Sequence, residues 1–544
     1  MRVVDDINAS PHAIPVSGDI RFDNRFTNEL PADPTVGPET RQVPGAAFSL
    51  VEPVHTANPR LIAWTSDLAD ELGFDDDFWS TETAAEIFTG NVLLPGSEPY
   101  AANYGGHQFG NWAGQLGDGR AIALGEIVDR GGQHQTLQLK GAGPTPYSRR
   151  ADGLAVLRSS VREFLCSEAM HHLGIPTTRA LTLALTGTDV VRDMFYDGNP
   201  AAEPGAVVCR VAPSFLRFGT YQLPAARGEL DQLRQLADFT IRHYHPHLDL
   251  DGGPEVYEAW FDEICRSSCD LVVHWMRVGF VHGVMNTDNM SIHGLTIDYG
   301  PYGWLDDYDP NWTPNTTDAG GRRYRFGHQP QITQWNLLQL ANALYPLVER
   351  AEGFEASLSG FAERFTTGFR SMMLDKLGLA ERPVSDGFDD GAADEDDELI
   401  GELTDVLQLA ETDMTIFFRL LAKPGLSLQT LEDAYYEPGA LGSDESARIE
   451  AWLDRYRARI GDDKRSDDDR FAAMNSVNPN YVLRNYLAQQ AIDAAETGDY
   501  SLVTTLATVL RRPYDEQPAA AEYSKKRPDW ARSRPGCSML SCSS

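Results

Sequence analysis

The chain has 544 residues, 42% of them hydrophobic, so it is long enough to bury a large core in two or three packing units. Acidic residues outnumber basic ones by 80 to 46, and this net charge of −34 argues against nucleic acid as a partner. No apolar run reaches the roughly 20 residues that span a bilayer, and the chain does not open on a signal-peptide pattern. We therefore expect a folded cytoplasmic protein without a membrane partner.

The basic residues are unusual because only six of the 46 are Lys and the rest are Arg. An acidic surface with few Lys is typical of proteins that stay soluble at high salt, where charge repulsion is screened. The composition therefore predicts a halophilic protein. Stability measured against KCl concentration tests this, since a halophilic protein loses stability in dilute buffer.

In chain order, the first clear elements are two strands, at 120–128 and 134–140, with a turn at 129–132 between them. Apolar residues at helical spacing predict a helix over 154–173, which ends before Gly174-Ile175-Pro176. Further strands are expected at 180–186 and 206–211, and helices at 228–243 and 254–278. After residue 331 the pattern is helical almost throughout.

A protein kinase has a first lobe of strands with one helix and a second lobe that is mostly helical, and the predicted elements follow the same order. We predict an α+β, bilobal, protein-kinase-like fold with an N-terminal extension and a large helical C-terminal region. The predicted parts are an extension with a Pro-rich arm (1–100), a nucleotide-binding region (101–225), a helical lobe (226–380), an acidic linker or loop (381–398), a helical region (399–530) and a flexible tail (531–544).

Residues 282–300 resemble a kinase catalytic segment that has lost its catalytic Asp. In the kinase pattern a His is followed two residues later by the base Asp and seven residues later by a metal-binding Asn, and a second metal-binding Asp opens the next turn. Here His282 and Asn289 keep the seven-residue step and Asp298 opens the turn, but Val284 occupies the position of the base. Either the chain is an inactive kinase or another residue is the base, and Asp288 is the candidate.

Lys140 is the only Lys in the first 375 residues, which suggests a position where Arg does not fit. It ends the second predicted strand, where kinases place the Lys that binds phosphate. That Lys usually pairs with a Glu of the following helix, here Glu163 or Glu168. Helical periodicity does not decide between them.

Other candidate phosphate ligands lie on both sides of Lys140. Gly117, Gly119 and Arg120 form a turn before the first strand, where backbone N–H groups could approach a phosphate, whereas the residues Asp152-Gly153 could also form a plain helix cap. Two guanidinium groups near a predicted strand end could clamp one polyphosphate, although surface ion pairs are the simpler explanation for them. These two residues are Arg210 and Arg217.

Asn289 and Asp298 offer the oxygen ligands that Mg²⁺ requires, at kinase spacing. His243, His245 and His247 also form a cluster, but Pro246 interrupts any helix and no carboxylate motif accompanies them. We therefore predict no metal site at the three histidines.

Taken together, these motifs resemble the SelO (selenoprotein O) family of protein adenylyltransferases. The resemblance extends from about residue 40 to the C-terminus. The segments that carry it are 104–110, 115–120, 139–141, 145–149, 157–165, 282–291, 297–301, 329–330, 335–337 and 478–486.

The resemblance implies a kinase-like fold in which ATP is turned around, so that AMP is transferred to Ser, Thr or Tyr hydroxyls of protein substrates and pyrophosphate leaves. It implies that Asp288 accepts the proton, that Asn289 and Asp298 hold Mg²⁺, with Mn²⁺ as the alternative, and that Asp298 also contacts ATP. It also implies that Lys140 binds the phosphates and that Glu163, rather than Glu168, holds Lys140. The remaining implied nucleotide contacts are Gly117, Gly119, Arg120, Asp152, Gly153, Arg210 and Arg217.

Three alternatives remain open: transfer of UMP with Mn²⁺, an ordinary phosphotransferase with Asp288 as base, and a pseudokinase that binds nucleotide without turnover. The family also places selenocysteine near this end of the chain in some members, and Cys542 takes that position here. Cys537 and Cys542 on a flexible, exposed tail could form a reducible disulfide, and we hypothesise a redox-responsive tail.

Overall fold

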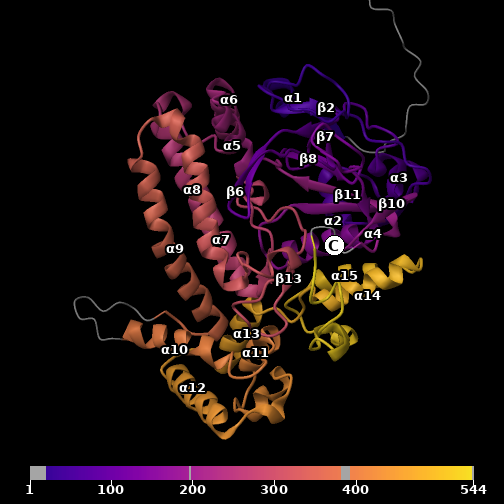
Figure 1. Cartoon of the computed structure of the whole chain (residues 1–544). Helices are drawn as coiled ribbons and strands as arrows, with labels where there is room; N and C mark the ends of the chain where they lie inside the picture. Colours follow the sequence, from indigo (N-terminus) through magenta and orange to yellow (C-terminus); the bar gives the residue numbers. More distant parts are fainter. Residues whose placement is uncertain (1–19, 195–197, 382–391, 542–544) are drawn as a thin grey trace, which may run out of the picture.

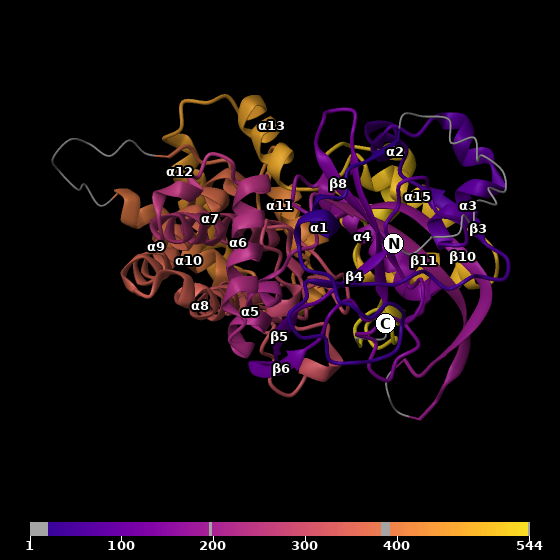
Figure 2. The same ribbon diagram turned by 90° about the horizontal axis from the view of Figure 1, so that it is seen from above.

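A computed structural model describes residues 20–194, 198–381 and 392–541 (Figure 1). Within these ranges a nine-stranded antiparallel sheet lies on one side of the molecule, and the long helices α7, α8 and α9 lie on the other (Figures 1 and 2). Along the sheet the strand order is β2-β4-β7-β8-β11-β10-β3, with β1 paired to β7 and β9 to β11. The strands of this sheet are β1 (Arg21–Phe22), β2 (Phe48–Leu50), β3 (Arg60–Trp64), β4 (Tyr100–Ala102), β7 (Ala121–Val128), β8 (His134–Lys140), β9 (Ala155–Val156), β10 (Arg179–Arg192) and β11 (Ala201–Ala212).

Alternate residues of the central strands enter two different hydrophobic clusters, because successive side chains of a strand point to opposite faces. Val207 and Cys209 of β11 pack with α2 (Ser66–Leu72) and α3 (Glu82–Thr89), whereas Ala206 and Val208 pack with α4 (Leu157–His172). The sheet is therefore buried on both faces, which explains why β7 is a nearly continuous apolar run.

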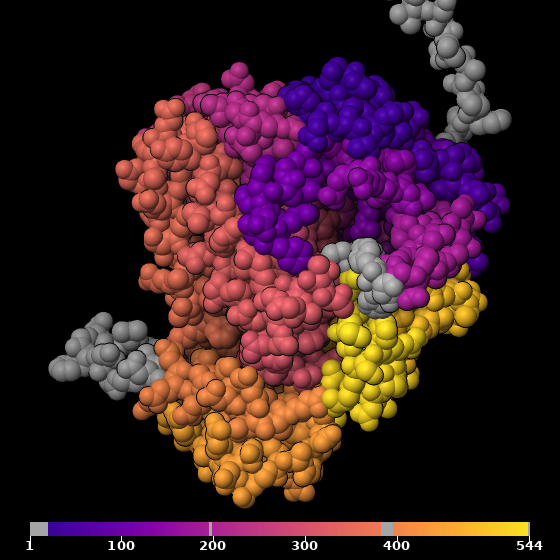
Figure 3. Space-filling view, in the orientation of Figure 1, coloured from indigo at the N-terminus to yellow at the C-terminus, as the bar shows by residue number. Residues whose placement is uncertain are grey.

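The two helices nearest the C-terminus, α14 (Asn485–Glu496) and α15 (Ser501–Leu510), pack on α4. In Figure 3 the yellow C-terminal residues consequently lie on the same face as purple residues of the N-terminal third. The remaining helices are α1 (Arg25–Glu29), α5 (Phe218–Arg227), α6 (Leu230–Tyr244), α7 (Glu255–Val278), α8 (Gln329–Val348), α9 (Glu352–Leu377), α10 (Ala392–Val406), α11 (Met414–Leu421), α12 (Ser443–Gly461) and α13 (Asp467–Val477).

The chain thus has the mixed composition of strands and helices expected from the sequence. The predicted hairpin of β7 and β8 is present, and Gly132 N–H donates to the Asp129 carbonyl over 2.9 Å to close its turn. The β10–β11 hairpin is longer than the predicted strands. Residues of the predicted extension are part of the sheet itself, since β2 and β3 form its two edges.

The acidic stretch predicted as a linker or loop is helical in its second half. α10 begins at Ala392, within the predicted 381–398 range, and residues 382–391 lie outside the described part of the chain. Asp396 of α10 is buried and pairs with Arg459 of α12 over 2.7 Å. At least one of the acidic residues therefore serves an internal contact between helices rather than solubility alone.

The tail is docked over its described residues, contrary to the prediction of a flexible, exposed segment. Leu540 N–H donates to the Pro314 carbonyl over 2.9 Å, and the Cys537 carbonyl accepts from Asn485 Nδ2 over 2.9 Å. Cys537 is only 2% exposed, and burial raises the pKa of its thiol to about 11, which is opposite to the exposed thiol that the redox hypothesis assumes. Cys542 lies outside the described residues.

The four remaining Cys are buried free thiols: Cys166, Cys209, Cys265 and Cys269. Among the described residues, no helix combines the length and the apolar character needed to cross a membrane.

A buried Arg joins two parts of the C-terminal region, the start of α14 and the start of α11, to the segment after β13 (Gly303–Trp304). Arg484, at the N-terminus of α14, is 1% exposed and contacts Asp306 over 3.2 Å and Asp413 over 2.8 Å. Asp413 in turn caps α11 by accepting from Ile416 N–H over 3.0 Å. Breaking a buried ion pair leaves an uncompensated charge in a low dielectric.

We predict that Arg484→Ala lowers the unfolding free energy of this region by about 3–5 kcal/mol, because Asp306 and Asp413 lose their buried counter-charge. The urea midpoint measured by circular dichroism checks this. Arg512→Ala is the control, since Arg512 is exposed and is 3.8 Å from its partner Asp515. Equal midpoints for the two variants would contradict the prediction.

Candidate functional site

A cavity of about 700 Å³ opens beside the sheet, at the edge where β8 ends and the 282–300 segment begins. Its wall combines the turn before β7, the segment between β8 and α4, and the 282–300 segment. The residues that line it are 104, 108, 116–121, 140, 147–154, 192, 210, 284, 286, 288, 289, 298, 300 and 301.

The cavity wall is rich in cationic side chains although the whole chain carries a net charge of −34. Lys140 and Arg210 line its interior, and Arg192 pairs with Asp152 over 2.7 Å. Within the described residues, the side chains of three further lining Arg make no hydrogen bond or ion pair. They are Arg120, Arg149 and Arg150. Cations without a protein partner in a concave wall are available to bind an anion.

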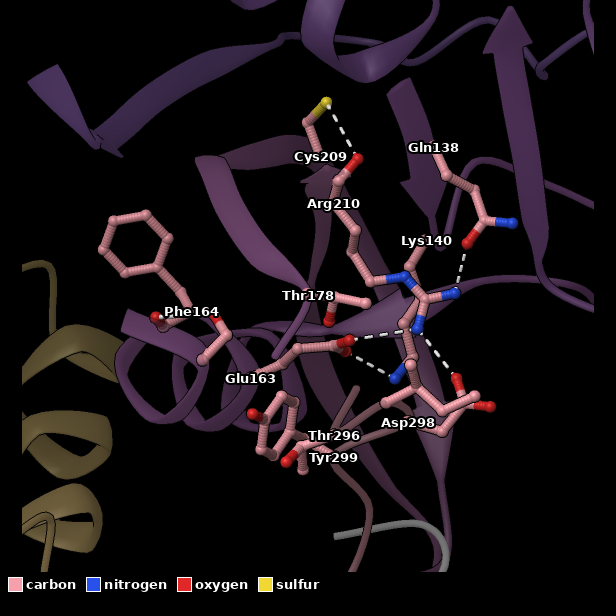
Figure 4. Close-up of polar contacts among 12 residues, drawn as sticks. Gln138, Lys140, Glu163, Phe164, Thr178, Cys209, Arg210, Thr296, Asp298 and Tyr299 are labelled. Atoms are coloured by element: carbon pink, nitrogen blue, oxygen red, sulfur yellow. Dashed lines mark hydrogen bonds and ion pairs between the residues drawn. The ribbon is translucent and has the colours of Figure 1, made fainter. Parts of the chain in front are cut away.

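Lys140, at the end of β8, forms an ion pair with Glu163 of α4 (Figure 4). Burial lowers the pKa of the Lys140 ammonium to about 8, although the charge of Glu163 opposes this shift. Glu168, the alternative that helical periodicity left open, pairs instead with Arg179 over 2.7 Å. Glu163 is therefore the Glu that contacts Lys140.

Arg210 and Arg217 converge on Asp298, so neither is the surface residue that abundance alone suggests. Arg210 Nη1 donates to Asp298 Oδ1 over 2.8 Å and to Glu163 Oε1 over 3.2 Å (Figure 4), and Arg217 also pairs with Asp298. Burial alone would raise the pKa of Asp298, but the charges of Arg217, Arg210 and Lys140 outweigh it and hold the pKa well below its usual range. Asp298 is therefore ionised at any physiological pH.

Arg217 and Glu163 lie behind the wall rather than on it. Arg217 is 1% exposed, and its Nη1 also donates to the Asp288 carbonyl over 2.7 Å. Glu163 is similarly buried between Lys140 and Arg210. The cavity thus brings together the other predicted site residues and places these two as supports.

The predicted glycine turns are required by close packing. A Cβ on Gly117, where φ is +74°, would lie 2.3 Å from the Tyr147 ring, and one on Gly119 would lie 2.9 Å from the Tyr147 carbonyl oxygen. A Cβ on Gly153, where φ is +73°, would lie 2.1 Å from the Gly143 carbonyl oxygen. Only glycine allows these segments to lie against each other and leave the cavity open.

Asp288 lies in the wall of the cavity on the short 3₁₀ helix Thr287–Asn289, close to the buried Val284. Burial raises the pKa of its carboxyl group to about 6, although a hydrogen bond from Gln108 opposes this shift. Its Oδ1 atom is buried and has no hydrogen-bond partner within the described residues. A carboxylate with a raised pKa and a free oxygen can accept a proton from a bound group.

The strand β5 (Gly105–Gln108) positions the 3₁₀ helix that carries Asp288. The motif arguments from the sequence did not assign this strand a role in the site. β5 is paired with β6 (Asn111–Gln115) and lies against the 3₁₀ helix. His107 N–H donates to Thr287 Oγ1 over 2.7 Å, and Gln108 Nε2 donates to Asp288 Oδ2 over 3.1 Å. In the sequence, the only sign of this role was that residues 104–110 belong to a segment that resembles the SelO family.

The Gln108 contact has a measurable consequence. Gln108→Leu removes the hydrogen bond that lowers the pKa of Asp288, so the pKa rises; for any reaction that uses Asp288 as its base, the acid limb of the pH–rate profile then moves to higher pH. We expect a loss of rate of about 10-fold near pH 6 and a smaller loss in alkaline buffer, where Asp288 is ionised in both proteins. A profile that drops by the same factor at every pH would show that Gln108 acts only on structure.

The residues of the site fit a divalent cation with oxygen ligands. Asn289 and the ionised Asp298 both line the cavity, and Asn289 Nδ2 donates to the Val284 carbonyl over 2.8 Å, which leaves its Oδ1 for another partner. A sheet-and-helix fold with a cationic cavity, an ionised carboxylate and a carboxyl group of raised pKa is typical of an enzyme that handles a polyphosphate.

The comparisons with known proteins agree with an enzyme that acts on a nucleotide. The sequence pattern of the family described as "Protein adenylyltransferase SelO" matches residues 35–511. Proteins called "Protein nucleotidyltransferase YdiU" match over nearly their full length: one from Azoarcus sp. is 59% identical over 530 residues (96% of this chain, 99% of that protein), and one from Rhodopirellula baltica is 56% identical over 546 residues (97% and 99%). A third, from Flavobacterium johnsoniae, is 53% identical over 532 residues (96% and 99%).

The chain belongs to the SelO family and is a protein nucleotidyltransferase. The membership predicted from the motifs is thereby confirmed. The class implies a nucleotide and protein acceptors as its substrates.

Proposed function

We propose that the enzyme transfers AMP from ATP to Ser, Thr or Tyr hydroxyl groups of protein substrates and releases pyrophosphate. The observation that carries the proposal is the cavity itself. The cationic groups and Asp288 face the same space, whereas the position of the kinase base is occupied by Val284, which cannot take a proton. The family description supports AMP as the transferred group.

The residues of the cavity fall into a cationic group, which would bind the phosphates, and an oxygen-ligand group, which would hold a metal ion. Lys140 and Arg210 are placed to neutralise the phosphates, and Arg120 offers a further charge. Arg149 and Arg150 extend this cationic wall toward the exposed end of the cavity. Because all five surround one space, an anion of several charges such as a triphosphate fits it better than a single phosphate does.

Asn289 and Asp298 would hold Mg²⁺, which supplies neutralisation of charge on the phosphate oxygens as the leaving group departs. Mn²⁺ is the alternative ion. Asp298 is suited to this because the surrounding Arg residues keep it ionised, and Arg217 fixes its carboxylate from behind.

The proposed transfer conserves atoms and charge. Asp288 takes the proton of the acceptor hydroxyl, the oxygen forms a bond to the α-phosphorus, and the bond between that phosphorus and the bridging oxygen breaks. Lys140 and the Arg residues stabilise the negative charge that develops on the leaving pyrophosphate. Arg217 keeps Asp288 in place through the Asp288 carbonyl.

We further propose that the fold is kinase-like and bilobal. Three features support this: a Lys at the end of a sheet strand pairs with a Glu of the next long helix, the 282–300 segment follows the long helix α7, and the chain after it is mostly helical. In this arrangement the cavity lies between the sheet and the helical part, as nucleotide sites of kinases do.

Isotope position tests the proposed function. The full-length enzyme with Mg²⁺ and a cell lysate receives ATP labelled at either the α- or the γ-phosphate, and labelled proteins are identified by mass spectrometry. We expect label only from α-labelled ATP. Label from γ-labelled ATP would establish an ordinary phosphotransferase, stronger labelling by α-labelled UTP would establish UMP transfer, and ATP binding without any labelling would establish a pseudokinase.

A further inference from the structure

Three side chains at the junction of α6 and α7, remote in sequence from the 282–300 segment, converge on a single point. His245 follows the last residue of α6, His247 lies two residues later, and Glu263 projects from α7. His245 Nδ1 is 2.7 Å from Glu263 Oε2, and His247 Nε2 is 2.6 Å from Glu263 Oε1. The carboxylate that the local sequence lacks is thus supplied by a different helix.

We propose that His245, His247 and Glu263 bind a divalent transition-metal ion, with zinc as the best match. Two imidazoles and one carboxylate form a ligand set that proteins use for Zn²⁺ when a water completes the coordination. Nitrogen ligands also select against Mg²⁺ and Ca²⁺, which prefer oxygen. This inference does not depend on the proposed function.

The distances allow the site to form with small side-chain rotations. The three potential ligand atoms lie within 4.8 Å of one another, and two atoms that each lie about 2.1 Å from one ion are at most about 4.2 Å apart. His247 can make the adjustment because its side chain is 61% exposed. The same exposure leaves room for a water at the fourth position.

The protonation states of these groups favour binding. Burial lowers the pKa of His245, so this imidazole is largely neutral at neutral pH. Burial would raise the pKa of Glu263, but its hydrogen bonds to His247 and His245 lower it overall, so the carboxylate is ionised. On binding, each facing imidazole nitrogen gives its lone pair to the ion, and its proton moves to the other ring nitrogen or to solvent.

His243 provides a matched control on the same turn. Its Nε2 is 2.8 Å from Glu29 Oε1 and its Nδ1 is 3.3 Å from Arg25 Nη1, so both ring nitrogens already have partners. It differs from His245 in position by two residues and is not part of the three-residue cluster.

Isothermal titration with Zn²⁺ in excess Mg²⁺ tests the proposal on four full-length proteins: wild type, His245→Ala, Glu263→Gln and the control His243→Ala. Substitution of a ligand should weaken zinc binding by about 100-fold, so wild type and His243→Ala should bind one more Zn²⁺ than the two ligand variants. Zn²⁺ should also raise the thermal midpoint of wild type and His243→Ala more than that of Glu263→Gln, which retains the shape of the side chain. Equal stoichiometry in all four proteins, or equal loss in His243→Ala, would overturn the proposal.

Discussion

Asp298→Asn should lower the rate constant for the proposed AMP transfer by about 10³-fold, because it removes the carboxylate that we propose to hold the metal ion and the charge that orients Arg210 and Arg217. Asn is the appropriate substitution because Asp298 has a φ of +57°, a left-handed conformation that Asn tolerates better than other side chains. The measurement is kcat with saturating ATP and Mg²⁺. A variant that retains more than about a tenth of the wild-type rate would contradict the assignment, because the loss of one such group is expected to cost 10²–10³.

The variant Asp298→Ala separates the charge from the backbone. Both variants lose the carboxylate, so we expect equal losses of rate. Ala should in addition be less stable than Asn, by about 1 kcal/mol, because it pays the cost of the left-handed conformation. Thermal unfolding of the two variants gives this difference.

Asp288 should give the enzyme an acid limb. Its pKa of about 6 means that the carboxyl group loses its proton as the pH rises through this value, and only the ionised form can accept a proton. The logarithm of the rate should therefore rise with unit slope below about pH 6 and level off above it. The measurement is a pH–rate profile at saturating ATP and Mg²⁺.

Asp288→Asn is the control for titration of the substrates. It should lower the plateau rate by about 10²–10⁴-fold and abolish the limb, since the residual reaction has no titrating base. A limb of unchanged position in Asp288→Asn would assign it to ATP or to the acceptor and contradict the role of Asp288 as base.

Much of this arrangement can be predicted from the sequence. The strand β7 is an apolar run, β8 alternates polar and apolar residues near its end, and a turn separates the two; α7 keeps a helical period over its whole length. The local sequence pattern and the structure therefore agree in these elements. Lys140 could be singled out because it is the only Lys in the first 375 residues. The seven-residue step from His282 to Asn289 could likewise be recognised from the sequence, because both residues lie in one short segment.

Long-range pairing could not be predicted from the periodicity of the sequence, and only the family resemblance favoured Glu163 as the partner of Lys140. Helical phase left Glu163 and Glu168 equivalent, and the choice depends on Lys140 and Arg179, which approach from different strands. The cluster of His245 and His247 lacked a carboxylate in the local sequence because Glu263 is supplied by α7.

The composition of a segment predicts its average exposure but not which of its residues make buried contacts. The tail contains polar residues, yet Cys537 is buried because the tail is docked: Leu540 N–H donates to the Pro314 carbonyl and the Cys537 carbonyl accepts from Asn485. The acidic stretch provides the buried pair of Asp396 with Arg459 as well as surface charge. Halophilic stability rests on composition alone and stays a prediction.

The central claim is that the cavity directs attack to the α-phosphorus of ATP. The most direct measurement is the identity of the small product, followed by ³¹P NMR during turnover on an acceptor protein identified by labelling. We predict one pyrophosphate released for each AMP attached to the acceptor, with no ADP. Formation of ADP together with a phosphorylated acceptor would contradict the account.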